Sequence, residues 1–264
     1  MFLTSTADGV TTLTLNRPPV NAISEDWVAA FETKLDDLAR GPRFTVLHIR
    51  SEQKVFCAGA DLKEVQERMD APDGPDRMYA FVAGIQRLYF RIEALPQVTL
   101  AEIGGAAMGG GFELALACDL RIAANEAKIG LPEVRLGLIP GAGGTQRLTR
   151  LFGPGLASRL ILGAEILDGA AAASLGVVHW AAPRAELTQC ATELARRIAG
   201  LPAAALSTSK ACIAAAQQPG RGGFTDELDF TRSLLTNTET RQRVTAFLAG
   251  ADDASKQTIK RTAR

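Results

Sequence analysis

A turn built almost entirely of glycine and alanine, Gly104 to Gly111, constrains the fold of this chain more than any other segment. The segment from Val98 to Ile103 before it is strand-like, and a helix is expected to start near Gly110. Glycine at such a junction lets another backbone or a ligand approach closely. Because strand and helix patterns alternate along much of the chain, the sequence predicts an α/β core.

Several further elements are predicted on either side of this turn. Val10 to Leu15 alternates like a half-buried strand, and Ser24 is expected to cap a helix that ends near Gly41. The polar stretch from Glu64 to Arg77 contains two prolines and a glycine, so we expect a loop there after a short helix. The remaining predictions are strands at 44–49, 120–123, 127–130 and 177–180, a helix at 78–95, mostly helical structure after residue 155 and an all-helical segment at 201–264.

The glycine-rich turn does not match the two common phosphate-binding patterns. The dinucleotide fingerprint needs glycine at its first, third and sixth positions. Counted from Gly109, the third position is Gly111 but the sixth is Leu114. No Lys-Ser or Lys-Thr pair follows the glycines, which excludes a Walker A loop. Two interpretations remain, namely tight helix packing over small residues, or backbone N–H groups that face an anionic ligand at a helix N-terminus.

Two glutamates beside glycine-rich turns favour the functional interpretation. Glu113 follows the first turn, and Glu133 precedes the second, which runs from Gly137 to Thr145. A carboxylate in apolar surroundings is expensive to bury, so its pKa rises toward neutrality. Such a pair predicts acid–base chemistry on a substrate that develops negative charge on oxygen.

A further small-residue turn, Phe56 to Lys63, predicts the other half of an oxyanion site. It reads Phe-Cys-Ala-Gly-Ala-Asp-Leu-Lys. An ordinary strand–helix junction explains it structurally. In the functional interpretation the N–H of Ala60 pairs with one from the Gly109–Gly111 run, because two such donors make an oxyanion hole.

Composition and charge exclude several other classes of protein. The 264 residues carry 29 basic and 29 acidic side chains, which argues against a general nucleic-acid binder. The two histidines, His48 and His179, lie among aliphatic residues, so we expect no metal site and no histidine triad. The four cysteines form no Cys-x-x-Cys pair and are expected to be reduced. The N-terminal residues lack the features of a signal peptide and no membrane-length apolar run occurs, so we expect a cytoplasmic protein that does not bind membranes.

Taken together, these segments closely resemble the crotonase family, the enoyl-CoA hydratases and isomerases. The 20-residue separation of Glu113 and Glu133 also matches the hydratases. The matching segments occur in the family's order at 16–22 (Asn-Arg-Pro-Pro-Val-Asn-Ala), 56–64, 109–115 (Gly-Gly-Gly-Phe-Glu-Leu-Ala), 118–121 and 131–147.

The resemblance implies a spiral of β-β-α repeats at residues 1–200, which holds the active site. A helical C-terminal region at 201–264 would mediate trimer contacts, and two trimers commonly stack into a hexamer. The ligand would be an acyl-CoA thioester, so coenzyme A is part of the substrate and no separate cofactor is expected. On this mapping Ala60 and Gly110 supply the oxyanion-hole N–H groups. The expected CoA and substrate contacts are Pro19, Val20, Ala22, Ala58, Asp61, Leu62, Lys63, Gly109, Pro140 and Gly141.

The activity that the resemblance implies is hydration of a 2-enoyl-CoA to a 3-hydroxyacyl-CoA, in fatty acid or branched-chain acyl-CoA breakdown. Glu133 would deliver the proton to Cα, and Glu113 would hold the attacking water. A double-bond isomerase, another acyl-CoA lyase or hydrolase of the family, and a non-catalytic CoA-ester binder remain alternatives. The chain departs from the family after Phe247, where a basic contact to the CoA 3′-phosphate is usual. We expect that segment to be a solvated tail, with Lys256, Lys260 or Arg261 as the alternative source of this contact.

Overall fold

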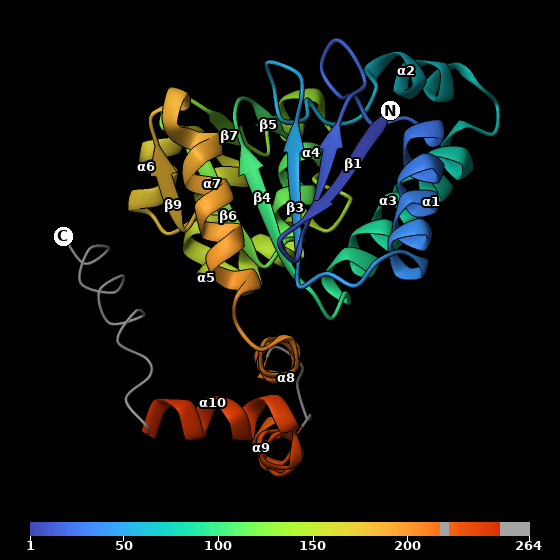
Figure 1. Ribbon diagram of the computed structural model, residues 1–264. Coiled ribbons are helices and arrows are strands. Elements are labelled where there is room, and N and C mark those ends of the chain that lie inside the picture. Colours follow the sequence, from blue (N-terminus) through green and yellow to red (C-terminus); the bar gives the residue numbers. More distant parts are fainter. Residues whose placement is uncertain (217–221, 249–264) are drawn as a thin grey trace. The chain divides into compact units, whose positions relative to one another are not determined.

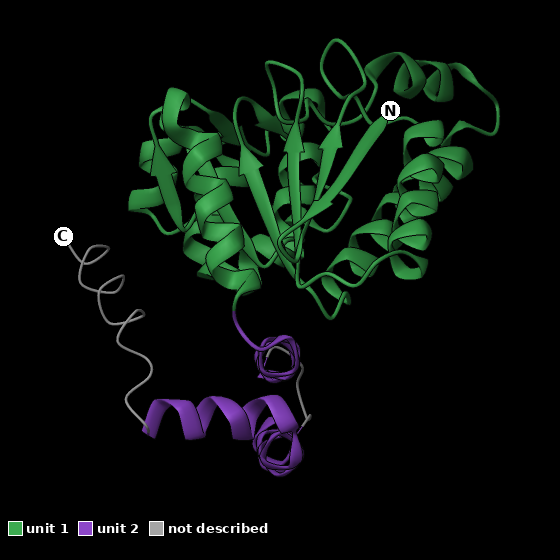
Figure 2. Ribbon diagram, viewed as in Figure 1, with its two compact units in different colours: residues 1–200 green, residues 201–264 purple. Residues whose placement is uncertain are grey.

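The computed structural model describes residues 1–216 and 222–248 of the chain. Lys256, Lys260 and Arg261 lie outside the described residues. The chain divides into two compact units, Met1–Gly200 and Leu201–Arg264 (Figure 2).

The larger unit is built on a six-stranded sheet (Figure 1). Its strand order is β1-β2-β3-β4-β6-β9; β1 pairs antiparallel with β2, and all other neighbours are parallel. The predicted strands at Val10–Leu15 and Val98–Ile103 are confirmed with the same bounds. The six strands are β1 (Phe2–Ala7), β2 (Val10–Leu15), β3 (Val46–Ser51), β4 (Val98–Ile103), β6 (Leu120–Ala124) and β9 (Trp180–Ala182).

Short strands form a second, smaller sheet, and two of them follow β4 and β6 directly in the order of strands along the chain. It contains β5 (Ala107–Met108), β7 (Lys128–Gly130) and β8 (Ile166–Asp168), with β5 parallel and β8 antiparallel to β7. Two isolated parallel bridges, Ile23 to Ala60 and Cys57 to Ala107, extend the same pattern to earlier parts of the chain. Successive passes of the chain therefore contribute a long strand, then a short strand or bridge, then a helix, as a spiral of β-β-α repeats requires.

Helices cover the sheets and complete the core. Ser24 caps α1 by accepting a hydrogen bond from Trp27 N–H at 3.1 Å, as predicted. Helix α1 packs against β1 and α3, while α7 packs on β2, β3, β4, β6 and β9 (Figure 1). The helices of this unit are α1 (Glu25–Arg40), α2 (Leu62–Asp70), α3 (Gly74–Glu93), α4 (Gly110–Leu116), the 3₁₀ helix η1 (Glu133–Leu136), α5 (Gly144–Leu162), α6 (Gly169–Ser174) and α7 (Arg184–Ala199).

Two local predictions are wrong. The stretch 64–77 is not a loop, because α2 continues to Asp70 and α3 already begins at Gly74. Pro75 lies in the first turn of α3, where a helix loses no hydrogen bond to a missing N–H. The strand expected at 177–180 lies instead at Trp180–Ala182, and the short strand β8 was not predicted. A three-residue strand is too short for its period to stand out from the surrounding helical sequence.

Among its described residues, the smaller unit contains the helices α8 (Ala203–Ala216), α9 (Gly223–Thr236) and α10 (Thr238–Leu248). Large apolar side chains of α9 and α10 are exposed to an unusual degree, among them Phe224 at 87% and Leu248 at 80%. No single helix in the described ranges has the length and apolarity to span a membrane; α7 and α8 reach those limits only as a bent pair.

Candidate active site

The glycine-rich turn brings Gly109 directly against Glu133. Gly109 has a φ of +51° and donates its N–H to Gly130 O of β7 at 3.0 Å. A Cβ added at Gly109 would lie 2.7 Å from Glu133 Oε1. Only glycine leaves room for that carboxyl and also adopts this backbone conformation without strain. The two segments named from the sequence therefore meet in space.

The two predicted N–H donors, Ala60 and Gly110, lie next to each other. A Cβ added at Gly110 would be 3.9 Å from Ala60 N, and one added at Gly59 would be 3.4 Å from Gly110 N. The bridge between Ile23 and Ala60 uses Gly59 O and Asp61 N, which turns Ala60 N–H away from its partner strand. Within residues 1–216 and 222–248, neither Ala60 N–H nor Gly110 N–H donates to a backbone acceptor. This arrangement suits an incoming oxygen anion.

Glu113 is buried one turn into α4, with 2% of its surface exposed. Its Oε1 accepts a hydrogen bond from Gly144 N–H at 2.6 Å. Burial, and secondly the charge of Glu133, raise the pKa of Glu113 from 4.5 to about 8, while Gly144 N–H and Arg147 act in the opposite direction. A carboxyl with such a pKa exchanges protons near neutral pH.

Glu133 is the first residue of η1 and is only partly buried. Its Oε2 is inaccessible to solvent and has no hydrogen-bond partner among the described residues. Burial raises the pKa of Glu133 as well. A buried oxygen without a donor is costly in a folded protein, so it indicates a group kept ready for a ligand.

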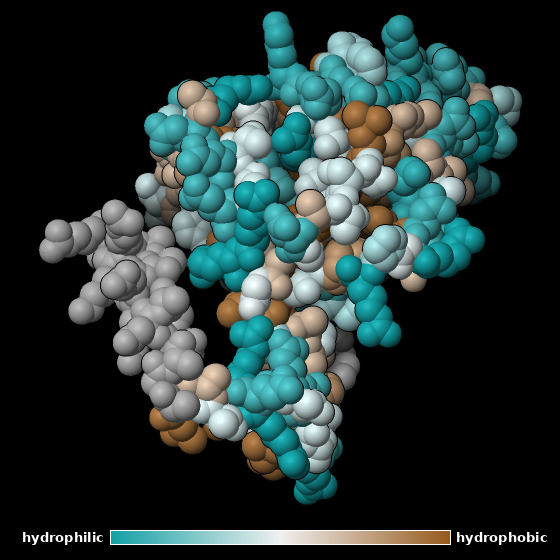
Figure 3. Space-filling model, in the orientation of Figure 1, coloured by the Kyte–Doolittle hydropathy of each residue, from teal (hydrophilic) through white to brown (hydrophobic). Residues whose placement is uncertain are grey.

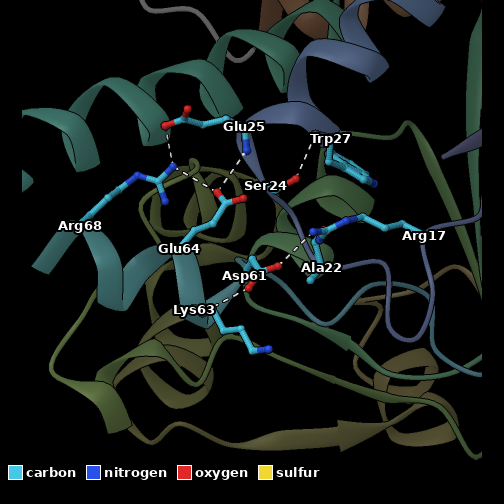
Figure 4. A network of polar contacts seen from close by, with 9 residues as sticks. All are labelled: Arg17, Ala22, Ser24, Glu25, Trp27, Asp61, Lys63, Glu64 and Arg68. Carbon is cyan, nitrogen blue, oxygen red and sulfur yellow. Dashed lines mark hydrogen bonds and ion pairs between the residues drawn. The ribbon is translucent and has the colours of Figure 1, made fainter. Parts of the chain in front are cut away.

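The segment 17–22 lies against the turn at 58–61, which assembles several of the expected CoA contacts. Ala58 N–H donates to Val20 O at 3.0 Å. Arg17 bridges the two segments: Nη1 donates to Ala22 O at 2.5 Å, and Nη2 lies 3.1 Å from Asp61 Oδ2 (Figure 4). Arg17 was not among the predicted site residues, although it belongs to the Asn-Arg-Pro-Pro motif.

Asp61 is also the N-cap of α2, and Leu62 and Lys63 are the exposed first residues of that helix. Asp61 Oδ1 accepts Lys63 N–H at 3.2 Å, as an N-cap does. Farther along α2, Arg68 is buried and pairs with Glu25 of α1 at 2.6 Å and Glu64 at 3.2 Å (Figure 4). These contacts tie α2 to α1, so the turn that carries Ala60 N–H is held at both ends.

The remaining predicted contacts are Pro140, Gly141 and Pro19. Pro140 is buried beside Glu113, because a Cβ added at Gly144 would lie 2.8 Å from both Pro140 Cβ and Glu113 Oε1. Gly141 O accepts a hydrogen bond from Gln86 of α3. Pro19 is exposed in the turn after β2, and none of the contacts described above joins it to the glutamates.

Comparisons with known proteins agree with this architecture. The sequence pattern of the family described as enoyl-CoA hydratase/isomerase matches residues 5–253. A crystal structure of enoyl-CoA hydratase from Bacillus anthracis superimposes with a TM-score of 0.87 at 32% identity, over 94% of this chain and 96% of that one. The chain therefore belongs to the enoyl-CoA hydratase/isomerase family and has the crotonase fold.

Curated relatives match the chain over part of their length. Enoyl-CoA hydratase domain-containing protein 2, mitochondrial, of Mus musculus is 45% identical over 186 residues, which are 70% of this chain and 61% of that protein. Methylglutaconyl-CoA hydratase, mitochondrial, of Homo sapiens is 43% identical over 172 residues, 64% of this chain and 49% of that protein. These matched segments span about half to three fifths of the length of the two relatives.

No metal-binding cluster of three or more His, Cys, Asp or Glu side chains occurs in the part of the chain that the structure describes.

Proposed function

We propose that this protein is an enoyl-CoA hydratase that adds water across the double bond of a 2-enoyl-CoA and forms a 3-hydroxyacyl-CoA. The observation that carries the proposal is the meeting of two carboxyls of raised pKa, Glu113 and Glu133, with the adjacent N–H groups of Ala60 and Gly110. The names of the relatives described above support the same reaction.

The first step of the proposed mechanism is polarisation of the thioester. Ala60 N–H and Gly110 N–H bind the carbonyl oxygen, which makes Cβ of the conjugated double bond electrophilic. Negative charge builds on that oxygen as water attacks, so the donors bind the transition state more strongly than the substrate. Loss of one such donor raises a barrier by about 2.7–4 kcal/mol.

The two glutamates supply the proton transfers. In the proposal Glu113 holds and activates the water that attacks Cβ, with its carboxyl oriented by Gly144 N–H. Glu133, whose Oε2 has no partner within the described residues, delivers the proton to Cα. General acid–base catalysis of this kind contributes roughly 10²–10⁴-fold. The raised pKa of each carboxyl suits it to exchange protons near neutral pH.

The contact between segments 17–22 and 58–61 supports a proposal for where the CoA part of the substrate binds. We assign it to the surface formed by Val20, Ala22, Ala58 and Asp61, with exposed Lys63 at its edge. The ammonium of Lys63 suits an anionic group, as a mobile point charge does.

We also propose that residues 201–264 mediate assembly of a homotrimer or of a hexamer made from two trimers. Apolar side chains reach the surface over α9 and α10, as the brown regions there indicate (Figure 3). Exposed apolar area of this kind marks a contact surface in soluble proteins. Sedimentation velocity of the wild type and of Phe224→Ser tests this assignment; a wild-type monomer contradicts it.

The test of the function is loss of enone absorbance when purified protein hydrates crotonyl-CoA. Wild type should hydrate it, and Glu133→Gln or Glu113→Gln should lower turnover by about 10²-fold or more while the CoA ester still binds. Glu165→Gln is a matched control, because Glu165 is a surface carboxyl paired with Arg159. Full activity of Glu113→Gln refutes the water-holding role. Activity only on a 3-enoyl-CoA identifies an isomerase, which needs one carboxylate.

A further inference from the structure

One face of α3 carries three polar side chains that each reach a different part of the active site. Gln86, Tyr89 and Glu93 follow one another at spacings of three and four residues, so they share a helix face. The rest of that helix buries apolar residues such as Ile85 and Leu88.

Tyr89 connects α3 to the proposed oxyanion site. It is fully buried, and its hydroxyl donates to Gly110 O at 2.6 Å. Burial raises the pKa of Tyr89 well above its ordinary value, which keeps the hydroxyl proton in place for that bond. The first turn of α4 is thus fixed from outside the glycine-rich segment.

Gln86 and Glu93 connect α3 to the loop that contacts Glu113. Gln86 Nε2 donates to Gly141 O at 2.6 Å. Glu93 holds Arg147 of α5 through two hydrogen bonds, Nε to Oε1 at 2.7 Å and Nη2 to Oε2 at 2.9 Å. A paired, planar contact of this type fixes the direction of a guanidinium.

Arg147 in turn fixes the loop beside Glu113. The guanidinium is buried, and Nη1 donates to Ala142 O at 2.7 Å. It also occupies the space beside Gly143, since a Cβ added there would lie 2.1 Å from Nη1. Ala142 and Gly143 directly precede Gly144, whose N–H binds Glu113.

We propose that Arg147, held by Glu93 of α3, is a positioning residue that sets the orientation and charge environment of Glu113. The inference rests on the proposed function, because it assigns Arg147 a role through the carboxyl that holds the water. Its two contributions are separable: the bonds to Ala142 and Glu93 shape the loop, and the positive charge favours the ionised form of Glu113. The other titratable groups that act on Glu113 are Glu133 and Tyr89.

The variants Arg147→Lys and Arg147→Met separate the effect of Arg147 on the shape of the loop from the effect of its positive charge on Glu113. Arg147→Lys keeps the charge but cannot make the paired contact, so turnover of crotonyl-CoA should fall about 10²-fold with little change in KM. The pH at which Glu113 titrates should stay near that of wild type. Arg147→Met should lower turnover similarly and also raise the titration pH of Glu113, because the cation is lost. Glu93→Gln, which keeps Arg147, is the variant to use if Arg147→Met does not fold; turnover should fall.

The titration is read by NMR of protein labelled with ¹³C at the glutamate carboxyls, with the Glu113 signal assigned from Glu113→Gln. This measurement needs no turnover, so it tests the inference even if the wild type fails to hydrate any enoyl-CoA. Glu165→Gln, which removes the similar paired contact of Arg159 on the same helix, is the control and should change neither readout. Unchanged turnover in Arg147→Lys together with an unmoved Glu113 titration in Arg147→Met overturns the proposal.

Discussion

Replacing Glu113 by glutamine should change how stability depends on pH. The pKa of Glu113 rises from 4.5 to about 8 on folding, so the folded state binds more protons than the unfolded state between these values. Such a group stabilises the fold fully below the lower value, and that contribution is lost as pH rises through the window. Each pH unit is worth about 1.4 kcal/mol, hence about 4 kcal/mol between about pH 5 and about pH 8. Glutamine does not titrate and escapes this loss.

The measurement is urea unfolding of wild type and Glu113→Gln, followed by circular dichroism at both pH values and at fixed protein concentration. The free energy of unfolding of Glu113→Gln should rise relative to that of wild type by up to about 4 kcal/mol toward about pH 8. Glu165 is the control, because Arg159 lowers its pKa at the surface and its replacement should give no gain at high pH. An equal difference between Glu113→Gln and wild type at both pH values refutes the claim that folding raises the pKa of Glu113.

Three other substitutions test the geometry of the site. Gly109→Ala places a methyl group 2.7 Å from Glu133 Oε1, so kcat for crotonyl-CoA should fall by about 10²-fold with little change in KM in steady-state assays. Gly144→Ala crowds Glu113 Oε1 at 2.8 Å and should likewise lower kcat, which the same assay measures. Asp61→Ala removes the N-cap of α2 and the partner of Arg17, and urea unfolding should show a loss of about 1 kcal/mol or more.

The parts of the fold and site that the sequence predicted are those encoded by neighbouring residues. Val98–Ile103 is a strand in which four apolar residues, Val98, Leu100, Ala101 and Ile103, suit a sheet buried on both faces. Ser24 caps α1 because a short side chain there reaches the free N–H of Trp27. The glutamates were found because carboxylates stand out in glycine-rich, apolar turns. The family resemblance, rather than periodicity, supplied the spiral arrangement of these elements.

The contacts that the sequence did not predict join residues far apart in the chain. Gln86 and Tyr89 look like ordinary polar and aromatic positions of a helix, and nothing local connects them to Gly141 or Gly110. Arg147 lies at the end of a recognised motif, but its partner Glu93 is 54 positions away. The wrong prediction of a loop at 64–77 has a different cause: proline and glycine usually break helices, but a helix tolerates both in its first turn.

For the glycine-rich turn, tight packing and function do not exclude each other, because the same packing creates the oxyanion site. A Cβ added at Gly111 would lie 2.2 Å from Cys57 O, so this glycine is needed for close contact between the turns at 56–61 and 104–111. That contact places Ala60 N–H beside Gly110 N–H, two donors that lie 50 positions apart in the sequence. Substitution of Gly111 should therefore destroy both the packing and the oxyanion site, whereas substitution of Gly109 acts mainly through Glu133.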